Sequence, residues 1–157
     1  MTLKLMSIAS IAFALFMTEL SPSAVASKEP CSLLTVEQVS SAMGVAMGLG
    51  QSPVPEGCFW DESGKKTGKH VSLRISTTKH FAAGKTPIPG AEKPALTGVG
   101  DEAYYSYFVA PRYDKYKIVD LHFKKGDAIL LIEMRGLPLE EAKAQAKVLA
   151  LNALNKF

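Results

Sequence analysis

Alternation of apolar and polar residues predicts several β-strands. In the run 70–78, valine, leucine and isoleucine alternate with serine and arginine, as in a half-buried antiparallel strand. The runs 117–124 and 128–135 alternate in the same way on either side of Gly126-Asp127, and this pattern predicts a β-hairpin. We expect one face of that hairpin to carry Val119, Leu121, Phe123, Leu130, Ile132 and Met134. Cys58–Asp61 and the aromatic run 102–109 predict two further strands.

Two helices are predicted from their ends and their apolar faces. Thr35 and Gln38 have the spacing of a capping box, and Gly44 is a suitable stop, so a short N-terminal helix is expected between them. Pro138 at the first helical position, followed by Glu140 and Glu141, opens a long C-terminal helix. Its apolar stripe comprises Leu139, Ala142, Ala146, Leu149, Ala153 and Phe157.

The stretch Lys79–Gly100 is rich in proline and glycine and is expected to be irregular. Long irregular stretches in compact domains are often functional. With 157 residues, the chain fits one domain. The predicted fold is α+β: an antiparallel sheet of about five strands, with a short N-terminal helix, a long C-terminal helix and one disulfide.

The first 26 residues have the pattern of a cleaved secretory signal. Lys4 precedes the apolar run Leu5–Met17, and Ala24-Val25-Ala26 supplies small residues before the expected cleavage site. The alternative is an uncleaved membrane anchor. We expect residues 27–157 to form one exported domain, soluble in the periplasm or outside the cell, without stable membrane insertion. Cys31 follows a polar segment rather than a lipobox, so no lipid anchor is expected.

Cys31 and Cys58 are the only cysteines of the chain. Export places them in an oxidising compartment, where a structural disulfide is expected. The alternative is a catalytic thiol, but no sequence signature marks the base that would activate it.

Several segments follow one another in an order typical of a known family. They are Cys31–Val39, a glycine-containing loop, Cys58-Phe59-Trp60 and Gly98–Tyr104. The chain resembles an uncharacterised family of secreted bacterial proteins and lipoproteins, sometimes placed near the PsbP-like fold. The resemblance implies an antiparallel sheet flanked by helices, and a disulfide between the two cysteines. It supplies no active-site residues, and the missing lipobox departs from many members.

Motifs for cofactor, metal or nucleic-acid chemistry are weak. Gly98–Ala103 matches the letters of a dinucleotide fingerprint, but a strand is expected after it rather than a helix, and Asp101 and Glu102 would repel phosphate. The three histidines lack zinc-ligand spacing, and there is no nucleophile elbow. A net charge of +3 is small for a nucleic-acid protein. We therefore expect no cofactor, no metal and no nucleic-acid partner.

The densest group of aromatic and basic residues lies near position 110. The expected contact residues are Tyr107, Arg112, Tyr113 and Tyr116, because tyrosine and arginine are typical interface anchors. The alternative is that a terminal helix covers these aromatics.

These features favour a non-enzymatic binding or accessory module of the bacterial cell envelope. Its partner would be an unknown protein or envelope component, contacted through the aromatic region and Lys79–Gly100. An inhibitor or immunity-type protein that uses this stretch to block an enzyme is the alternative, and a small hydrolase is a third possibility.

Overall fold

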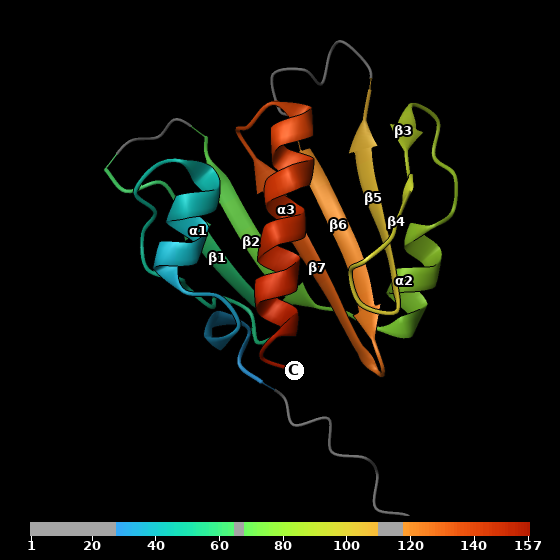
Figure 1. Ribbon diagram of the computed structural model, residues 1–157, viewed down its shortest axis with the longest axis horizontal. Coiled ribbons are helices and arrows are strands. Elements are labelled where there is room, and N and C mark those ends of the chain that lie inside the picture. Colours follow the sequence, from blue (N-terminus) through green and yellow to red (C-terminus); the bar gives the residue numbers. More distant parts are fainter. Residues whose placement is uncertain (1–27, 65–67, 110–117) are drawn as a thin grey trace, which may run out of the picture.

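The computed structural model describes residues 28–64, 68–109 and 118–157, which form an antiparallel sheet with helices packed against it (Figure 1). The predicted signal segment, 1–26, lies outside the described residues. The elements in chain order are η1 (Pro30–Ser32), α1 (Val36–Met43), β1 (Gly57–Asp61), β2 (His70–Ile75), α2 (Thr78–Gly84), β3 (Ala91–Glu92), β4 (Ala95–Leu96), β5 (Glu102–Phe108), β6 (Ile118–Lys125), β7 (Ala128–Arg135) and α3 (Leu139–Leu154). The predicted α+β class, with its short first helix and long last helix, is confirmed.

The sheet has seven strands, rather than the five or so predicted. Its order is β1-β2-β7-β6-β5-β3, with β4 also paired to β5. The two additional strands, β3 and β4, have two residues each, which is too short to show an alternating pattern in the sequence.

The β6–β7 hairpin has the predicted turn and register. Lys125 pairs with Ala128 across Gly126-Asp127, and Leu121 pairs with Ile132. Every residue of the predicted apolar face is buried. The pairing of the two strands places these side chains on the same face, toward the core, so this part of the prediction is confirmed.

One face of the sheet packs against α1 and α3, both of which lie in front of it in Figure 1. Leu73, Leu121 and Ile132 from the sheet are fully buried together with Val39 of α1 and Leu149 of α3. Burying one such side chain contributes about 1.5–3 kcal/mol. This core is the main source of stability. Because side chains alternate along a strand, it also determines which side chains lie on the opposite face of the sheet.

The ends of α1 agree with the prediction. The Thr35 hydroxyl accepts from the Gln38 backbone N–H at 3.2 Å, and the Gln38 side chain accepts from the Thr35 backbone N–H at 2.9 Å. Gly44 ends the helix with φ of +65°. Helix α3 begins at Leu139, so Pro138 is its N-cap rather than its first residue.

The prediction that the stretch Lys79–Gly100 is irregular is wrong. It contains most of α2 and both short strands, and β2 ends at Ile75 because Thr77 is the N-cap of α2. The Thr77 hydroxyl accepts from the His80 backbone N–H at 3.3 Å. Beyond the helix, the Lys93 ammonium donates to the Gly84 carbonyl at 2.6 Å. These contacts hold the stretch against the sheet.

Cys31 and Cys58 form a disulfide with their Cα atoms 4.9 Å apart, as predicted. The bond joins the residues around η1 to strand β1. Cys58 is fully buried in the core. The disulfide therefore lies at the core, as expected of a structural bond.

Candidate functional site

The sheet face opposite α1 and α3 has little helical cover. Helix α2 lies against its β5 corner, where Phe81 contacts Tyr104 with ring centroids 5.2 Å apart. Among the described residues, no helix covers the same face of β1, β2 and most of β7. We call this surface the uncovered face; its side chains come from alternate positions of β1, β2, β7 and β6.

One row of side chains crosses the uncovered face from strand to strand. Its members are register neighbours: Phe59, Ser72, Glu133, Asp120 and Ser106. Side chains opposite one another in an antiparallel pair lie on the same face, with Cβ atoms about 5 Å apart. The row therefore places two carboxyl groups, Asp120 and Glu133, side by side.

The two carboxyl groups have different surroundings. Glu133 accepts from Nε of Arg135 at 2.6 Å. Oδ1 of Asp120 is buried and has no hydrogen-bond partner among the described residues. Burial and, to a smaller extent, the nearby charge of Glu133 raise the pKa of Asp120 to about 7, although Arg74 and Arg135 act in the opposite direction. A buried acceptor without a donor is costly, and this cost favours the protonated form of the carboxyl group.

Ser72 has a similarly unusual position. Its side chain is fully buried, and its hydroxyl has no hydrogen-bond partner among the described residues. It lies between Phe59 and Glu133 in the row, so its hydroxyl shares the face with the carboxyl pair. Buried hydroxyl groups are normally hydrogen-bonded, and an exception requires an explanation.

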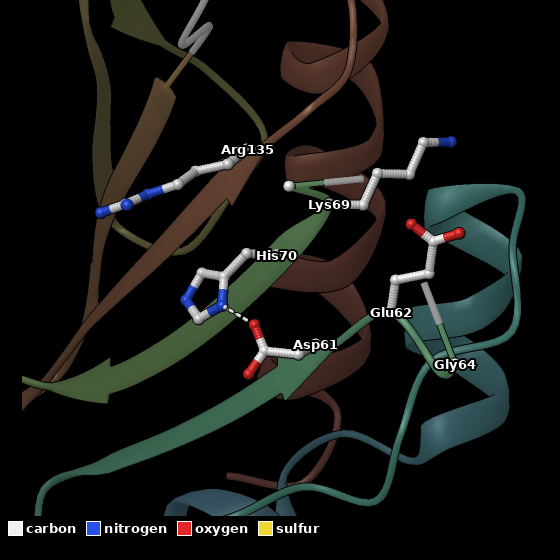
Figure 2. Close-up of a pocket in the computed structure, with 7 residues that line it drawn as sticks. Asp61, Glu62, Gly64, Lys69, His70 and Arg135 are labelled. Atoms are coloured by element: carbon white, nitrogen blue, oxygen red, sulfur yellow. Dashed lines mark hydrogen bonds and ion pairs between the residues drawn. The ribbon is translucent and has the colours of Figure 1, made fainter. Parts of the chain in front are cut away.

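His70 and Asp61 form the clearest polar pair at one end of the uncovered face. Nδ1 of His70 lies 2.8 Å from Oδ1 of Asp61 (Figure 2). With Ser72 on the same face, the chain has the three residue types of a Ser-His-Asp triad. However, the Ser72 hydroxyl is fully buried and makes no hydrogen bond to His70. The arrangement is not that of an accessible nucleophile beside its base.

A cavity of about 780 Å³ opens beside this pair. It is lined by Asp61, Glu62, Gly64, Gly68, Lys69, His70 and Arg135. Figure 2 shows that Arg135 extends away from the His70–Asp61 pair, while Lys69 extends to the other side. The Lys69 ammonium donates to the Met43 carbonyl at the end of α1. The lining groups therefore diverge, whereas catalytic groups converge on one reacting atom.

The structure buries Tyr107, the one predicted contact residue that it describes. Only 6% of Tyr107 is exposed, and its hydroxyl donates to Glu92 at 2.8 Å. It faces α3, where the Lys143 ammonium lies 5.4 Å from the ring centroid. Tyr107 is therefore not an exposed anchor, because alternation places it on the core face of β5. The other contact residues, Arg112, Tyr113 and Tyr116, lie outside the described residues.

Tyr104 faces the opposite side of β5 and is covered by α2. Its hydroxyl donates to the Phe81 carbonyl at 3.0 Å, and its ring stacks on His122. Burial lowers the pKa of His122 to about 4, with a smaller effect from the positive charge of Lys93. Strand β5 is thus covered by α3 on one face and, at Tyr104 on the other, by a helix that the sequence did not predict.

The glycine motif has a conformational explanation. Gly98 and Gly100 have positive φ angles, and the segment leads directly into strand β5. A Cβ on Gly100 would lie 2.2 Å from the backbone oxygen of Lys124. The glycines therefore permit a close turn at the sheet, and no helix N-terminus follows to receive a pyrophosphate.

Sequence reasoning did not single out Asp120, Glu133 or Ser72. A signal for the carboxyl pair was available, because the predicted hairpin register already places Asp120 opposite Glu133. The position of Ser72 in the same row depends on the pairing of β2 with β7, which joins segments far apart in the sequence.

Among the described residues, no three or more histidine, cysteine, aspartate or glutamate side chains are grouped so as to hold a metal ion. In the same part of the chain, no helix is long and apolar enough to cross a membrane. Comparison with protein-family models, with curated proteins and with solved structures finds no match for this chain.

Proposed function

We propose that this protein is a non-enzymatic binding module, exported to the bacterial cell envelope, that holds a partner on the uncovered face of its sheet. The observation that carries the proposal is the row across that face. Ser72 and Asp120 have buried polar atoms without hydrogen-bond partners, on a surface that no described helix covers.

The side chains next to the row are of the kinds found at binding surfaces. Arg74 is exposed, and its guanidinium lies 5.3 Å from the centroid of the Phe59 ring. Leu131 lies between Arg74 and His122 in the adjacent row. Arginine and aromatic side chains are enriched among the residues that contribute most to binding.

Export is supported by two features of the chain. Residues 1–26 have the pattern of a secretory signal, and Cys31 and Cys58 are joined by a disulfide. Structural disulfides persist mainly in oxidising compartments such as the periplasm. Together these features favour the envelope as the place of action.

A binding role agrees better with the polar groups than a hydrolytic role does. The His70–Asp61 pair has no accessible nucleophile beside it, since Ser72 is fully buried. The inhibitor alternative required a long free loop, but Lys79–Gly100 is held against the sheet through α2, β3 and β4. The observations therefore favour a partner that docks on the sheet.

The proposal is tested by capture from a solubilised envelope fraction with matched variants. Leu131→Arg places a long charged side chain on the uncovered face, and Leu151→Arg places the same side chain on the exposed face of α3, where Leu151 is 40% exposed. We expect Leu131→Arg to reduce capture of a specific partner by about tenfold or more, and Leu151→Arg to leave it unchanged. Equal capture by both variants would contradict the proposal.

A further inference from the structure

A second cavity lies at the end of the sheet where β2 stops and β7 starts, beside the end of the chain marked C in Figure 1. Its volume is about 580 Å³. Sites for small molecules usually have volumes of about 300–1,000 Å³. Ile75 and Leu130, register partners at these strand ends, are among the residues that line it. The cavity shares no lining residue with the row on the uncovered face.

Specific contacts hold the walls of this cavity in place. The Glu56 carbonyl accepts from the Ile75 backbone N–H at 2.7 Å, and the Ile129 carbonyl accepts from the Ser76 backbone N–H at 2.8 Å. A further part of the lining, Cys31, is tied to β1 by the disulfide. The cavity is thus formed before a ligand arrives, and such a site loses little conformational freedom when it binds.

The lining of the cavity is largely apolar. It includes Pro30, Cys31, Ile75, Leu130 and the ring of Phe157. Phe157 is 40% exposed, so part of a large aromatic side chain remains in contact with water beside the cavity. A ligand with an apolar body would remove this surface from water, and this burial favours binding.

The charged side chains of the lining are mainly acidic. Glu29, Glu56 and Asp127 contribute three carboxylates, and Lys28 contributes an ammonium. In the described part of the chain, none of the three carboxylates forms an ion pair. The Lys28 ammonium lies 5.1 Å from the centroid of the Phe157 ring. Negative charge is therefore in excess around the cavity, and a cleft lined by one sign of charge attracts ligands of the other sign.

We propose that this cavity is a second binding site, for a small organic amine that has an apolar body and one ammonium group. The apolar lining holds the body of the ligand, and the exposed carboxylates attract its ammonium. An inorganic cation would make no contact with the apolar lining, and an anion would be repelled by the carboxylates. The proposal does not depend on the role of the uncovered face.

The experiment uses phenylbutylamine as the probe, titrated into the protein and followed by backbone amide chemical shifts. We expect saturable shifts at Ile75, Ser76, Ala128 and Ile129, which line the cavity. Phenylbutanol has the same apolar body without the charge and should bind about tenfold more weakly, and phenylbutanoate should bind more weakly still. Butylamine keeps the ammonium but lacks the ring, and it should also bind at least about tenfold more weakly.

Matched variants locate the site. Ala128→Phe places a ring in the cavity, and Ala144→Phe places the same ring at an exposed position of α3. The first should weaken the binding of phenylbutylamine by about tenfold or more, because the ring occupies the space of the ligand, and the second should leave it unchanged.

A second pair of variants tests the charge without changing the shape of the cavity. Glu56→Gln should weaken the binding of phenylbutylamine by about threefold, since one exposed charge contributes modestly. Glu141→Gln makes the same change at the exposed start of α3 and should have no effect. The amide spectrum of each variant shows whether the fold is retained. If Ala128→Phe does not fold, the comparison of Glu56→Gln with Glu141→Gln decides.

Four results would overturn the proposal: no saturable shifts at the cavity, phenylbutanol or phenylbutanoate binding as tightly as the amine, undiminished binding by folded Ala128→Phe, or equal effects of Glu56→Gln and Glu141→Gln. These results are independent of capture from the envelope fraction. If the amine does not bind while Leu131→Arg still reduces capture, the amine site is wrong and the binding face stands. If the amine binds while capture ignores Leu131→Arg, the cavity stands and the proposed role of the uncovered face is wrong.

Discussion

The imidazole of His122 stacks on the ring of Tyr104, with ring centroids 4.6 Å apart and ring planes inclined by only 8°. Helix α2 closes over the pair, since Gly84 approaches both side chains. The stack joins α2 to the sheet at the edge of the uncovered face. A charge on the imidazole would therefore be placed in a poorly solvated position, which is why burial lowers the pKa of His122 to about 4.

This stack predicts a loss of stability in mild acid. The pKa of His122 falls from 6.5 in the unfolded chain to about 4 in the folded protein, so between these values the unfolded state binds more protons. Stability is then complete above pH 6.5 and decreases as the pH falls to 4. His122→Phe keeps the stacked ring and should remove about 1–2 kcal/mol of this decrease, allowing for partial solvation. Urea unfolding of the original protein and of His122→Phe at pH 7 and pH 4.5 measures this change in unfolding free energy. The same pH dependence in the two proteins would contradict the lowered pKa of His122.

Asp120 predicts a change of the opposite sign. Its pKa rises from 3.8 in the unfolded chain to about 7 in the folded protein, so its contribution is fully present below pH 3.8 and is lost as the pH rises through 7. Asp120→Asn does not titrate, and its stability relative to the original protein should increase by on the order of 2–4 kcal/mol between pH 4 and pH 8. The comparison uses the difference in unfolding free energy at each pH, which cancels the contribution of His122. If the difference in unfolding free energy between the two proteins were the same at pH 4 and pH 8, the raised pKa of Asp120 would be contradicted.

The disulfide should contribute substantially to stability. It closes a loop with a sequence separation of 27 residues, and chain entropy for that loop gives about 3–4 kcal/mol. The double variant Cys31→Ala/Cys58→Ala should lower the melting temperature by an amount that corresponds to most of this free energy. Reduction of the original protein by dithiothreitol should give a similar decrease. An unchanged melting temperature in both experiments would show that the bond has no structural role.

Two glycines with nearly the same backbone conformation should respond differently to substitution. Gly100 and Gly126 have φ angles of +59° and +57°, so alanine at either position costs about 1–2 kcal/mol of backbone strain. At Gly100 the added Cβ would also lie 2.2 Å from the Lys124 carbonyl oxygen, while at Gly126 it would meet nothing within 4 Å. Gly100→Ala should therefore destabilise the protein more than Gly126→Ala does. Equal decreases in melting temperature would contradict the close approach at Gly100.

The parts of the fold predicted from sequence are those with strong local signals. The capping box at Thr35 and Gln38 fixed the start of α1, and the turn at Gly126-Asp127 fixed the β6–β7 register. Helix α2 has seven residues and only one large buried apolar side chain, Phe81, which is too little for an amphipathic pattern. Strands β3 and β4 form only because β5 is beside them.

The candidate site depended on tertiary information. Alternation alone could not decide which face of β5 contacts the core, and this is why Tyr107 was expected at the surface but is buried against α3. For Asp120 and Ser72, the unusual property is the missing hydrogen-bond partner. That property follows from four neighbouring strands and from the position of the helices, so no short stretch of sequence encodes it.

The most direct test of the binding face is photocrosslinking in intact cells with matched aromatic positions. Benzoylphenylalanine replaces Phe59, in the row that crosses the uncovered face, or Phe157, which is 40% exposed near the end of α3. Because both changes replace one aromatic residue by another, they differ mainly in where the reactive group lies. We predict that the probe at position 59 forms a discrete crosslinked product that Leu131→Arg abolishes, and that the probe at position 157 does not form this product. The same product from position 157 alone, or a product from position 59 that persists with Leu131→Arg, would contradict the assignment of the uncovered face as the binding surface.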